Sequence, residues 1–167
     1  MQNNQEKVSA EKNNLTPPRI GTYWPGQGGI YIGQMLDGET QIALIMATKP
    51  FEGEWGNYGE TIPGEFSFSN GQHNSQLILA AEPENQLLLD ITKHEADGHT
   101  DFYLPANFEQ NLICANAQAH VEKVWHWSST QYSAITAWFQ DFEYGGQLID
   151  SKGCRYAARA VRRLIIE

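Results

Sequence analysis

The chain has 167 residues, of which 41% are hydrophobic and 19% are charged. This size and composition predict one soluble globular domain and argue against a disordered chain. The formal net charge of −9 argues against duplex nucleic acid as a partner, because phosphate binding requires a basic surface. No apolar run approaches the roughly 20 residues of a membrane span, and the first residues lack the apolar segment of a secretory signal, so we expect no signal peptide.

The chain begins with a polar segment. Residues 1–16 are mostly Gln, Asn, Glu, Lys and Ser, which predicts an arm that is flexible or becomes ordered only in an assembly. Pro17-Pro18 ends the arm with a stiff extended piece, so residues 17–167 are expected to form the domain. The spacing of the two cysteines, Cys114 and Cys154, leaves open whether they pair.

A β-hairpin is predicted next. Two β-rich runs, residues 30–33 and 41–47, flank the turn signal Asp37-Gly38. Residues 50–72 are rich in Gly, Glu and aromatic residues and show little periodicity, so we expect a long ordered loop there.

Helical patterns follow the predicted loop. Residues 73–96 show one that Glu82-Pro83 interrupts, and residues 106–120 show another. Four apolar residues are expected to share one face of the second helix: Phe108, Leu112, Ile113 and Ala115.

The pattern becomes β-like from Val124 onward. Strands are predicted at residues 125–130, 137–142, 147–149 and 159–165. The large side chains of Trp127, Trp138 and Phe142 are expected to fill the core. We expect the arginines of the last strand to pair with Asp141 or Glu143. The order of hairpin, helices and antiparallel strands predicts an α+β fold.

Four blocks of residues stand out along the chain. They are Tyr23-Trp24-Pro25-Gly26-Gln27-Gly28-Gly29-Ile30-Tyr31; Asp101-Phe102-Tyr103-Leu104-Pro105 with Glu109; Trp127-Ser128-Ser129-Thr130 with Ala137-Trp138, Phe142, Gly145, Gln147 and Lys152; and Arg159-Ala160-Val161-Arg162-Arg163. Together they resemble the signature of DUF1566 domains, also called Lcl C-terminal-type domains, in a version frequent in phage and prophage members. The resemblance covers residues 19–165. It implies a C-type-lectin-like fold with antiparallel β-sheets and two helices.

The resemblance also implies a function. Related folds occur in bacterial adhesins and phage receptor-binding proteins, where exposed side chains recognise ligands. We therefore expect a non-catalytic binding module of a phage or prophage, such as a tail-fibre tip, that attaches to a protein or glycan receptor. The alternatives are an assembly subunit that docks another phage protein, and an intracellular host-modulating protein or enzyme. A homo-oligomer stays open, and the expected location is the virion or the host cytoplasm.

Three patterns suggest site chemistry, but each is incomplete. Glu82-Pro83-Glu84-Asn85 resembles an element of calcium-dependent lectins, without the second element that such lectins add. Cys154 with His126 is conceivable as a nucleophile and base, but no catalytic motif surrounds them. A further cluster has side chains that suit a transition metal: His94, Asp97, His99 and Asp101. We therefore predict no catalytic residue, no metal and no cofactor.

The predicted binding face joins two segments. Residues 131–136 carry apolar side chains in an otherwise polar, turn-like stretch, as a recognition surface would, and the hairpin before the last strand adds further exposed groups. The predicted ligand-binding residues are Gln131, Tyr132, Ser133, Ile135, Thr136, Tyr144, Gln147, Asp150, Lys152 and Tyr156. The alternative for Tyr132 is that its ring packs on the arginine-rich last strand.

Overall fold

The computed structural model describes residues 16–166, so the predicted arm lies outside the described residues except for Thr16. The described residues contain one seven-stranded sheet, three α-helices and a short 3-10 helix. The predicted α+β class is therefore confirmed. The prediction of several sheets and two helices is wrong, because the strands join into one sheet and the first helical pattern yields two helices.

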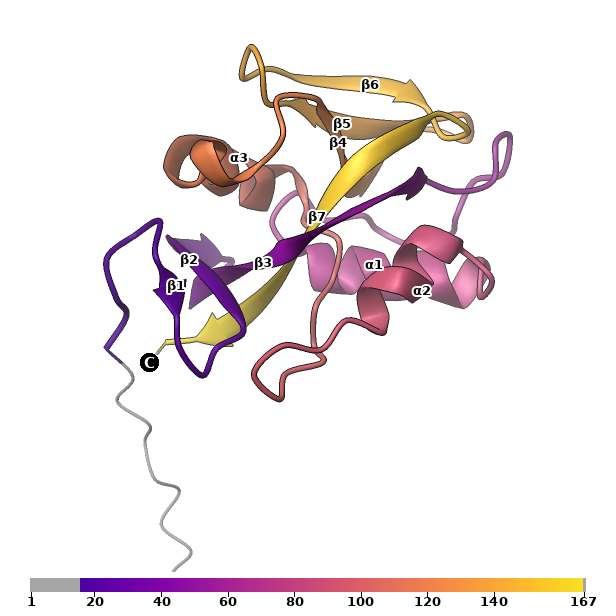
Figure 1. Cartoon of the computed structure of the whole chain (residues 1–167). Coiled ribbons are helices and arrows are strands. Elements are labelled where there is room, and N and C mark those ends of the chain that lie inside the picture. The colour runs from indigo at the N-terminus through magenta and orange to yellow at the C-terminus, as the bar shows by residue number, and fades with distance from the viewer. Residues whose placement is uncertain (1–15, 167) are drawn as a thin grey trace, which may run out of the picture.

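The sheet has the strand order β1-β2-β3-β7-β4-β5-β6 (Figure 1). The strands are β1 (Tyr23–Trp24), β2 (Gly29–Asp37), β3 (Thr40–Glu54), β4 (Trp125–Gln131), β5 (Thr136–Asp141), β6 (Gln147–Ser151) and β7 (Arg155–Ile165). All pairings are antiparallel except that of β4 with β7, which are parallel at His126 and Ala157. The first long strands and the last strand thus lie side by side at the centre.

The predicted hairpin is present as β2 and β3, but β3 is longer than the sequence suggested. Residues 50–54 belong to this strand rather than to a loop. Phe51 and Gly53 are buried, whereas Glu52 and Glu54 are exposed, which is the two-residue alternation of a strand with one buried face. Pro50 lies at an irregularity in the β3–β7 register, where a proline is tolerated.

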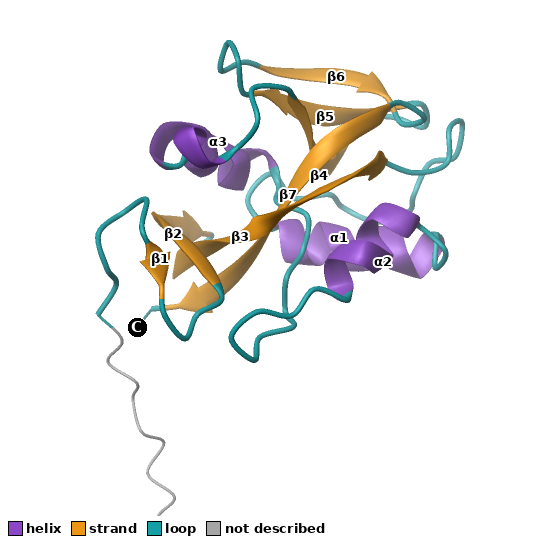
Figure 2. Ribbon diagram, in the orientation of Figure 1, coloured by secondary structure: helices purple, strands orange, loops and turns teal. Residues whose placement is uncertain are grey.

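The helices lie on both sides of the central strands (Figure 2). They are α1 (Gly71–Ala81), α2 (Gln86–Thr92) and α3 (Asn107–Asn116), followed by the 3-10 helix Gln118–His120. Helices α1 and α2 contribute to one apolar cluster and α3 to another. The neighbours Ala160 and Val161 of β7 belong to different clusters, because successive side chains of a strand point to opposite faces.

Hydrogen-bonding side chains set where α1 and α2 begin. Asn70 precedes α1, and its side chain accepts a hydrogen bond from the backbone nitrogen of His73. Asn85 does the same for α2 through Leu88. The Glu82-Pro83 break between them leaves room for this second start signal, which explains why one helical pattern becomes two helices.

The predicted face of the third helix is wrong. Phe108 and Ala115 are exposed, and the buried side of α3 carries Glu109 and Gln110 beside Ile113. These two polar side chains are buried because each has fixed partners. The carboxylate of Glu109, for example, accepts hydrogen bonds from the backbone nitrogens of Gly71 and Ala106.

Two of the three large aromatic side chains predicted to fill the core are buried. Trp127 and Phe142 are fully buried, but Trp138 is only half-buried and Phe139 takes the inner position. Adjacent residues of β5 point to opposite faces, and both of these residues are large and aromatic. Residue type alone therefore could not show that Phe139, rather than Trp138, is the buried residue.

The arginines of β7 form ion pairs, but with partners other than the predicted Asp141 and Glu143. The pairs are Arg155 with Glu52 at 2.8 Å, Arg159 with Glu122 at 3.0 Å, Arg162 with Asp101 at 2.8 Å, and Arg163 with Asp37 at 2.7 Å and Glu109 at 2.8 Å. They join the last strand to strands, loops and a helix far away in sequence. The thiols of Cys114 and Cys154 are free.

Candidate functional site

Four aromatic side chains form a continuous row on the surface, which we call the aromatic ridge: Phe108, Phe68, Trp138 and Tyr132. Successive ring centroids are separated by 5.8, 6.1 and 5.7 Å. Phe108, Phe68 and Tyr132 are 51%, 44% and 59% exposed. Aromatic rings that stay this exposed while contacting one another are typical of interaction surfaces.

The ridge is assembled from four separate parts of the chain. Trp138 lies on the outer face of β5 and Phe108 in the first turn of α3. Phe68 belongs to the loop before α1, and Tyr132 follows β4. The backbone nitrogen of Phe108 donates a hydrogen bond to the carbonyl oxygen of Phe68 at 2.9 Å. The loop and the helix are therefore fixed to each other.

A buried asparagine holds the loop that carries Phe68. The side-chain oxygen of Asn74 accepts a hydrogen bond from the backbone nitrogen of Ser67 at 2.8 Å, and its nitrogen donates to the Ser67 carbonyl at 2.7 Å. Thr130 also donates to this carbonyl. Because the backbone nitrogen and the carbonyl oxygen of Ser67 are both hydrogen-bonded, the backbone next to Phe68 is held in place, which reduces the entropy lost on binding.

Ile149 extends the ridge onto β6. It is 39% exposed and lies opposite Trp138 in the β5–β6 register. Residues opposite each other in two strands share one face of the sheet. The apolar surface therefore runs from α3 across β5 to the edge of the sheet.

Polar side chains near the ridge are occupied by internal hydrogen bonds. Gln147 donates to the carbonyl oxygen of Asn107 at 2.6 Å, and the hydroxyl groups of Ser133 and Thr136 bind each other at 2.8 Å. Asn70 donates to the carboxylate of Asp37. The ridge thus offers apolar contact area and few uncommitted hydrogen-bonding groups.

The ten residues predicted to bind ligand do not form one patch. Thr136 and Gln147 share the face of Trp138, whereas Asp150 shares the opposite face with Phe139, as the register and the alternation of β5 and β6 require. Tyr132 and Ile135 are exposed, as is Tyr144 in the turn before β6. Tyr132 packs on Trp138 rather than on the last strand.

Gln131 and Lys152, two of the predicted residues, hold the loop after β3. The Lys152 ammonium donates hydrogen bonds to the Glu60 carbonyl and to the Gln131 side-chain oxygen, both at 2.7 Å. It also lies 4.8 Å from the ring centroid of Trp55. Burial lowers the pKa of Lys152. The Gln131 side chain forms hydrogen bonds with the backbone nitrogen and the carbonyl oxygen of Ile62. The side chains of Gln131 and Lys152 therefore stabilise the fold.

Tyr156, another predicted ligand-binding residue, belongs to an aromatic cluster on the face of the sheet opposite to that of Trp138. Its ring centroid lies 4.6 Å from that of Trp127 and 5.3 Å from that of Trp125. Its hydroxyl donates a short hydrogen bond to the Asp150 carboxylate. Burial, together with this hydrogen bond, raises the pKa of Tyr156 well above its usual value.

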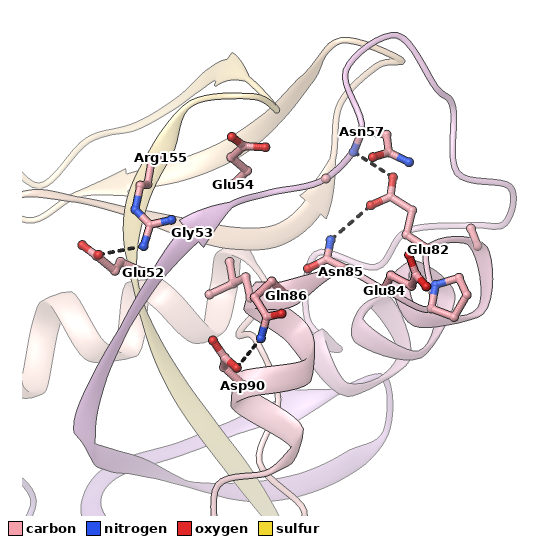
Figure 3. Close-up of a pocket in the computed structure, with 14 residues that line it drawn as sticks. Glu52, Gly53, Glu54, Asn57, Glu82, Glu84, Asn85, Gln86, Asp90 and Arg155 are labelled. Carbon is pink, nitrogen blue, oxygen red and sulfur yellow. Dashed lines mark hydrogen bonds and ion pairs between the residues drawn. The ribbon is translucent and has the colours of Figure 1, made fainter.

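An acidic hollow of about 590 Å³ lies between β3 and the loop that joins α1 to α2 (Figure 3). Glu82 is buried there and accepts hydrogen bonds from the Asn57 backbone and from the Asn85 side chain. Asn85 also donates to the Trp55 carbonyl. In Glu82-Pro83-Glu84-Asn85, the side chains of Glu82 and Asn85 therefore serve the turn between two helices. No group of three or more His, Cys, Asp or Glu side chains in residues 16–166 is arranged to hold a metal ion.

The second suggested metal cluster also has structural partners. The Asp97 carboxylate accepts hydrogen bonds from the Tyr23 hydroxyl at 2.9 Å and from the backbone nitrogens of Gly26 and Gly28. These bonds, with that from Tyr23 first, lower the pKa of Asp97. His99 bonds to the Gly26 carbonyl.

The remaining members of that cluster, Asp101 and His94, also have structural partners, as does His126 of the suggested catalytic pair. Asp101 pairs with Arg162, and His94 lies between two phenylalanine rings, where burial lowers its pKa. His126 is fully buried, with Nδ1 3.1 Å from the Val124 carbonyl and Nε2 3.5 Å from the Glu122 carboxylate. Its ring nitrogens are thus directed to partners other than the Cys154 thiol.

Sequence reasoning missed three members of the ridge. It placed Trp138 in the core and Phe108 on an apolar helix face, and it did not single out Phe68. A signal for Phe68 exists: it is an aromatic residue in the polar stretch Ser67-Phe68-Ser69-Asn70, which is the argument that identified Tyr132.

Comparison with models of known protein families gives no match, and no curated protein sequence is significantly similar to this chain. None of the helices in residues 16–166 has both the length and the apolar content needed to cross a membrane.

Proposed function

We propose that the chain is a non-catalytic binding module with a C-type-lectin-like fold of the DUF1566 type, and that its aromatic ridge docks on a protein receptor. The observation that carries the proposal is the ridge itself: four contacting aromatic rings on the surface, supported by bonded backbone on each side. Aromatic anchors with a fixed base contribute much of the affinity of protein interfaces.

Contacts among three of the four blocks that resemble DUF1566 domains support the proposed fold. Arg162 of the fourth block donates to Gln27 of the first block and pairs with Asp101 of the second. Tyr103 of the second block exchanges backbone hydrogen bonds with Val161 of the fourth. Blocks far apart in sequence thus form one bonded framework, as expected if their residues together define the fold.

The chemistry of the ridge favours a protein receptor over a glycan. Glycan recognition needs several free hydrogen-bonding groups beside an aromatic ring, because sugars present many hydroxyl groups. Here Gln147, Ser133 and Thr136 are bonded within the molecule. The rings of Tyr132 and Trp138 also meet edge to face, at an interplanar angle of 83°, so they do not form one flat platform.

The test uses labelled protein and a panel of immobilised bacterial cell envelopes. The double variant Phe108→Ser/Tyr132→Ser removes the two ends of the ridge and should abolish binding, because both rings are exposed anchors. The matched control is Tyr144→Ser, which removes an exposed aromatic residue in the turn before β6 and should bind as the unchanged protein does. Circular dichroism establishes that all three proteins are folded.

Enzymatic treatment of the envelopes identifies the receptor class. Protease treatment should abolish binding, whereas periodate oxidation, which destroys sugars, should leave it intact. The reverse result would replace the protein receptor with a glycan. Absence of binding to every envelope would contradict receptor attachment and favour the assembly-subunit alternative.

A further inference from the structure

A second hollow, of about 510 Å³, lies where β4 and β7 begin, and we call it the aromatic hollow. Three aromatic side chains line it: Trp125, Tyr144 and Tyr156. Trp125 contacts Tyr156, which belongs to the face of the sheet opposite to the aromatic ridge. The volume is within the range of small-molecule sites, about 300–1,000 Å³. The aromatic hollow is therefore a candidate site separate from the ridge.

Trp125 is 43% exposed, yet its ring is held by three contacts. The indole nitrogen donates a hydrogen bond to the Asp141 carboxylate at 3.1 Å. The ring packs on Phe139, with centroids 5.0 Å apart, and meets Tyr156 nearly at a right angle, with centroids 5.3 Å apart. An exposed ring that is already fixed loses little side-chain entropy when a ligand binds.

The carboxylate that bonds to Trp125 also fixes the turn that carries Glu143 and Tyr144. The other oxygen of Asp141 accepts hydrogen bonds from the backbone nitrogens of Glu143 at 2.8 Å and Tyr144 at 3.2 Å. The backbone nitrogen of Gly145 donates to the Asp141 carbonyl at 2.8 Å. One buried residue thus joins the turn to the indole, so two walls of the aromatic hollow are held in a fixed arrangement.

Charged side chains of both signs surround the exposed ring. Lys123 and Glu143 line the hollow and are exposed, and neither side chain has a hydrogen-bonding or ion-pair partner within residues 16–166. Arg155 and Glu52 pair with each other at 2.8 Å and also line the acidic hollow (Figure 3). Donors and acceptors of hydrogen bonds are therefore both available beside the indole.

We propose that the aromatic hollow binds a neutral pyranose sugar, with the sugar ring against Trp125 and its hydroxyl groups bonded to Lys123 and Glu143. The face of an indole ring carries partial negative charge, which attracts the C–H groups on the apolar side of a sugar ring. A hydroxyl group both donates and accepts hydrogen bonds, so it can use an ammonium group and a carboxylate side by side. Neither contact requires a metal ion.

The charges of the hollow favour a neutral ligand over an ion. The carboxylates of Glu52, Asp141 and Glu143 line it together with the basic groups of Lys123 and Arg155. A cation or an anion would therefore meet a like charge beside each opposite one. A wholly apolar group would bury some of these charges without giving them a partner, which is unfavourable. The ridge differs, because the polar groups near it are already bonded within the molecule.

This inference does not depend on the proposed receptor of the ridge. A site formed by exposed side chains that takes one sugar unit should have a Kd of about 1 mM. Such binding is too weak to hold the protein on a cell envelope by itself. Tyr144→Ser should accordingly weaken sugar binding and leave envelope binding unchanged.

NMR titration of the isotope-labelled full chain tests the site. The probes are the methyl glycosides of glucose, galactose, mannose and N-acetylglucosamine. At least one of them should shift the indole N–H signal of Trp125 and reach saturation by about 50 mM, well above the expected Kd. The signal is assigned by its absence from Trp125→Phe, and the indole signal of Trp138 should not move. Tetramethylammonium and inorganic phosphate should give no such shift.

Surface variants separate a binding role from a structural one. Glu143→Ala and Lys123→Ala remove exposed side chains, so they should fold normally and weaken sugar binding about fivefold or more. The matched control Glu39→Ala removes an exposed carboxylate from the β2–β3 turn and should bind as the unchanged protein does. The proposal is overturned if no glycoside shifts the Trp125 signal, if both Glu143→Ala and Lys123→Ala bind with unchanged affinity, or if only the ionic probes bind.

The two surfaces are distinguished by exchanging the variants between the two assays. Phe108→Ser/Tyr132→Ser should still bind the glycoside, and Glu143→Ala should still bind envelopes. A failure of one proposal therefore leaves the other intact. Loss of envelope binding in Glu143→Ala, without a response to any glycoside, would assign the aromatic hollow to a protein interface and overturn the sugar site.

Discussion

Replacing Trp138 with alanine should cost less stability than replacing its smaller neighbour Phe139. Phe139 is 3% exposed and packs against Trp125, Trp127 and Tyr156, with centroid distances of 5.0, 6.4 and 5.5 Å. Deleting a buried phenylalanine costs about 3–5 kcal/mol. Trp138 is half-buried, and its two aromatic contacts are worth about 0.5–1.5 kcal/mol each, so we expect about 1–3 kcal/mol for Trp138→Ala.

Thermal and urea unfolding, followed by circular dichroism, measure this difference. For a domain of this size about 1 kcal/mol corresponds to roughly 2–4 °C in Tm. Trp138→Ala should therefore lower the Tm by roughly 2–12 °C and Phe139→Ala by roughly 6–20 °C, measured in parallel. Trp138→Ala should also weaken envelope binding, because the ring is part of the ridge. A Trp138 variant at least as destabilised as the Phe139 variant would place Trp138 in the core and refute the alternation described for β5.

Three further predictions follow from the contacts of the frame. Asn74→Ala should lower stability by about 1–3 kcal/mol, because it leaves the Ser67 backbone nitrogen without its partner, and it should weaken envelope binding although Asn74 is buried. Burial acts to raise the pKa of Asp37, but hydrogen bonds from Ser69 and Arg163 outweigh it and lower the pKa. The stabilising contribution of Asp37 is therefore complete above its unfolded pKa of about 3.9 and is lost as the pH falls through the lower folded pKa; acid titration of Asp37→Asn should show a smaller loss of stability in that range. Excess EDTA should leave the Tm unchanged, and a fall that calcium or zinc restores would contradict the structural roles assigned to the acidic residues.

Local patterns predicted those elements whose signals lie close together in the chain. The hairpin β2–β3 follows from alternating apolar runs around Asp37-Gly38, and the helix break at Glu82-Pro83 is where the structure has it. The polar residue that starts each of α1 and α2, Asn70 and Asn85, is also a local feature. These elements depend on contacts within a few residues, and the sequence displays such contacts directly.

The candidate site could not be predicted in the same way, because burial within a strand or helix depends on distant partners. Trp138 and Phe139 are adjacent aromatic residues, and the sheet decides which of them faces inward. Lys152 was predicted to bind ligand from the hairpin before the last strand, but it is buried, which is rare for a lysine. Its position is stabilised by the Glu60 carbonyl and by Gln131, and the former contact spans 92 residues. No local pattern records such a contact.

The first residues of β5 alternate between positions in the core and positions on the surface. The inward residues Ala137 and Phe139 belong to the core, whereas Trp138 faces outward among rings supported by other elements. Changes at Thr136 and Trp138 should therefore alter the surface while the core is retained, as expected of a scaffold that presents binding residues.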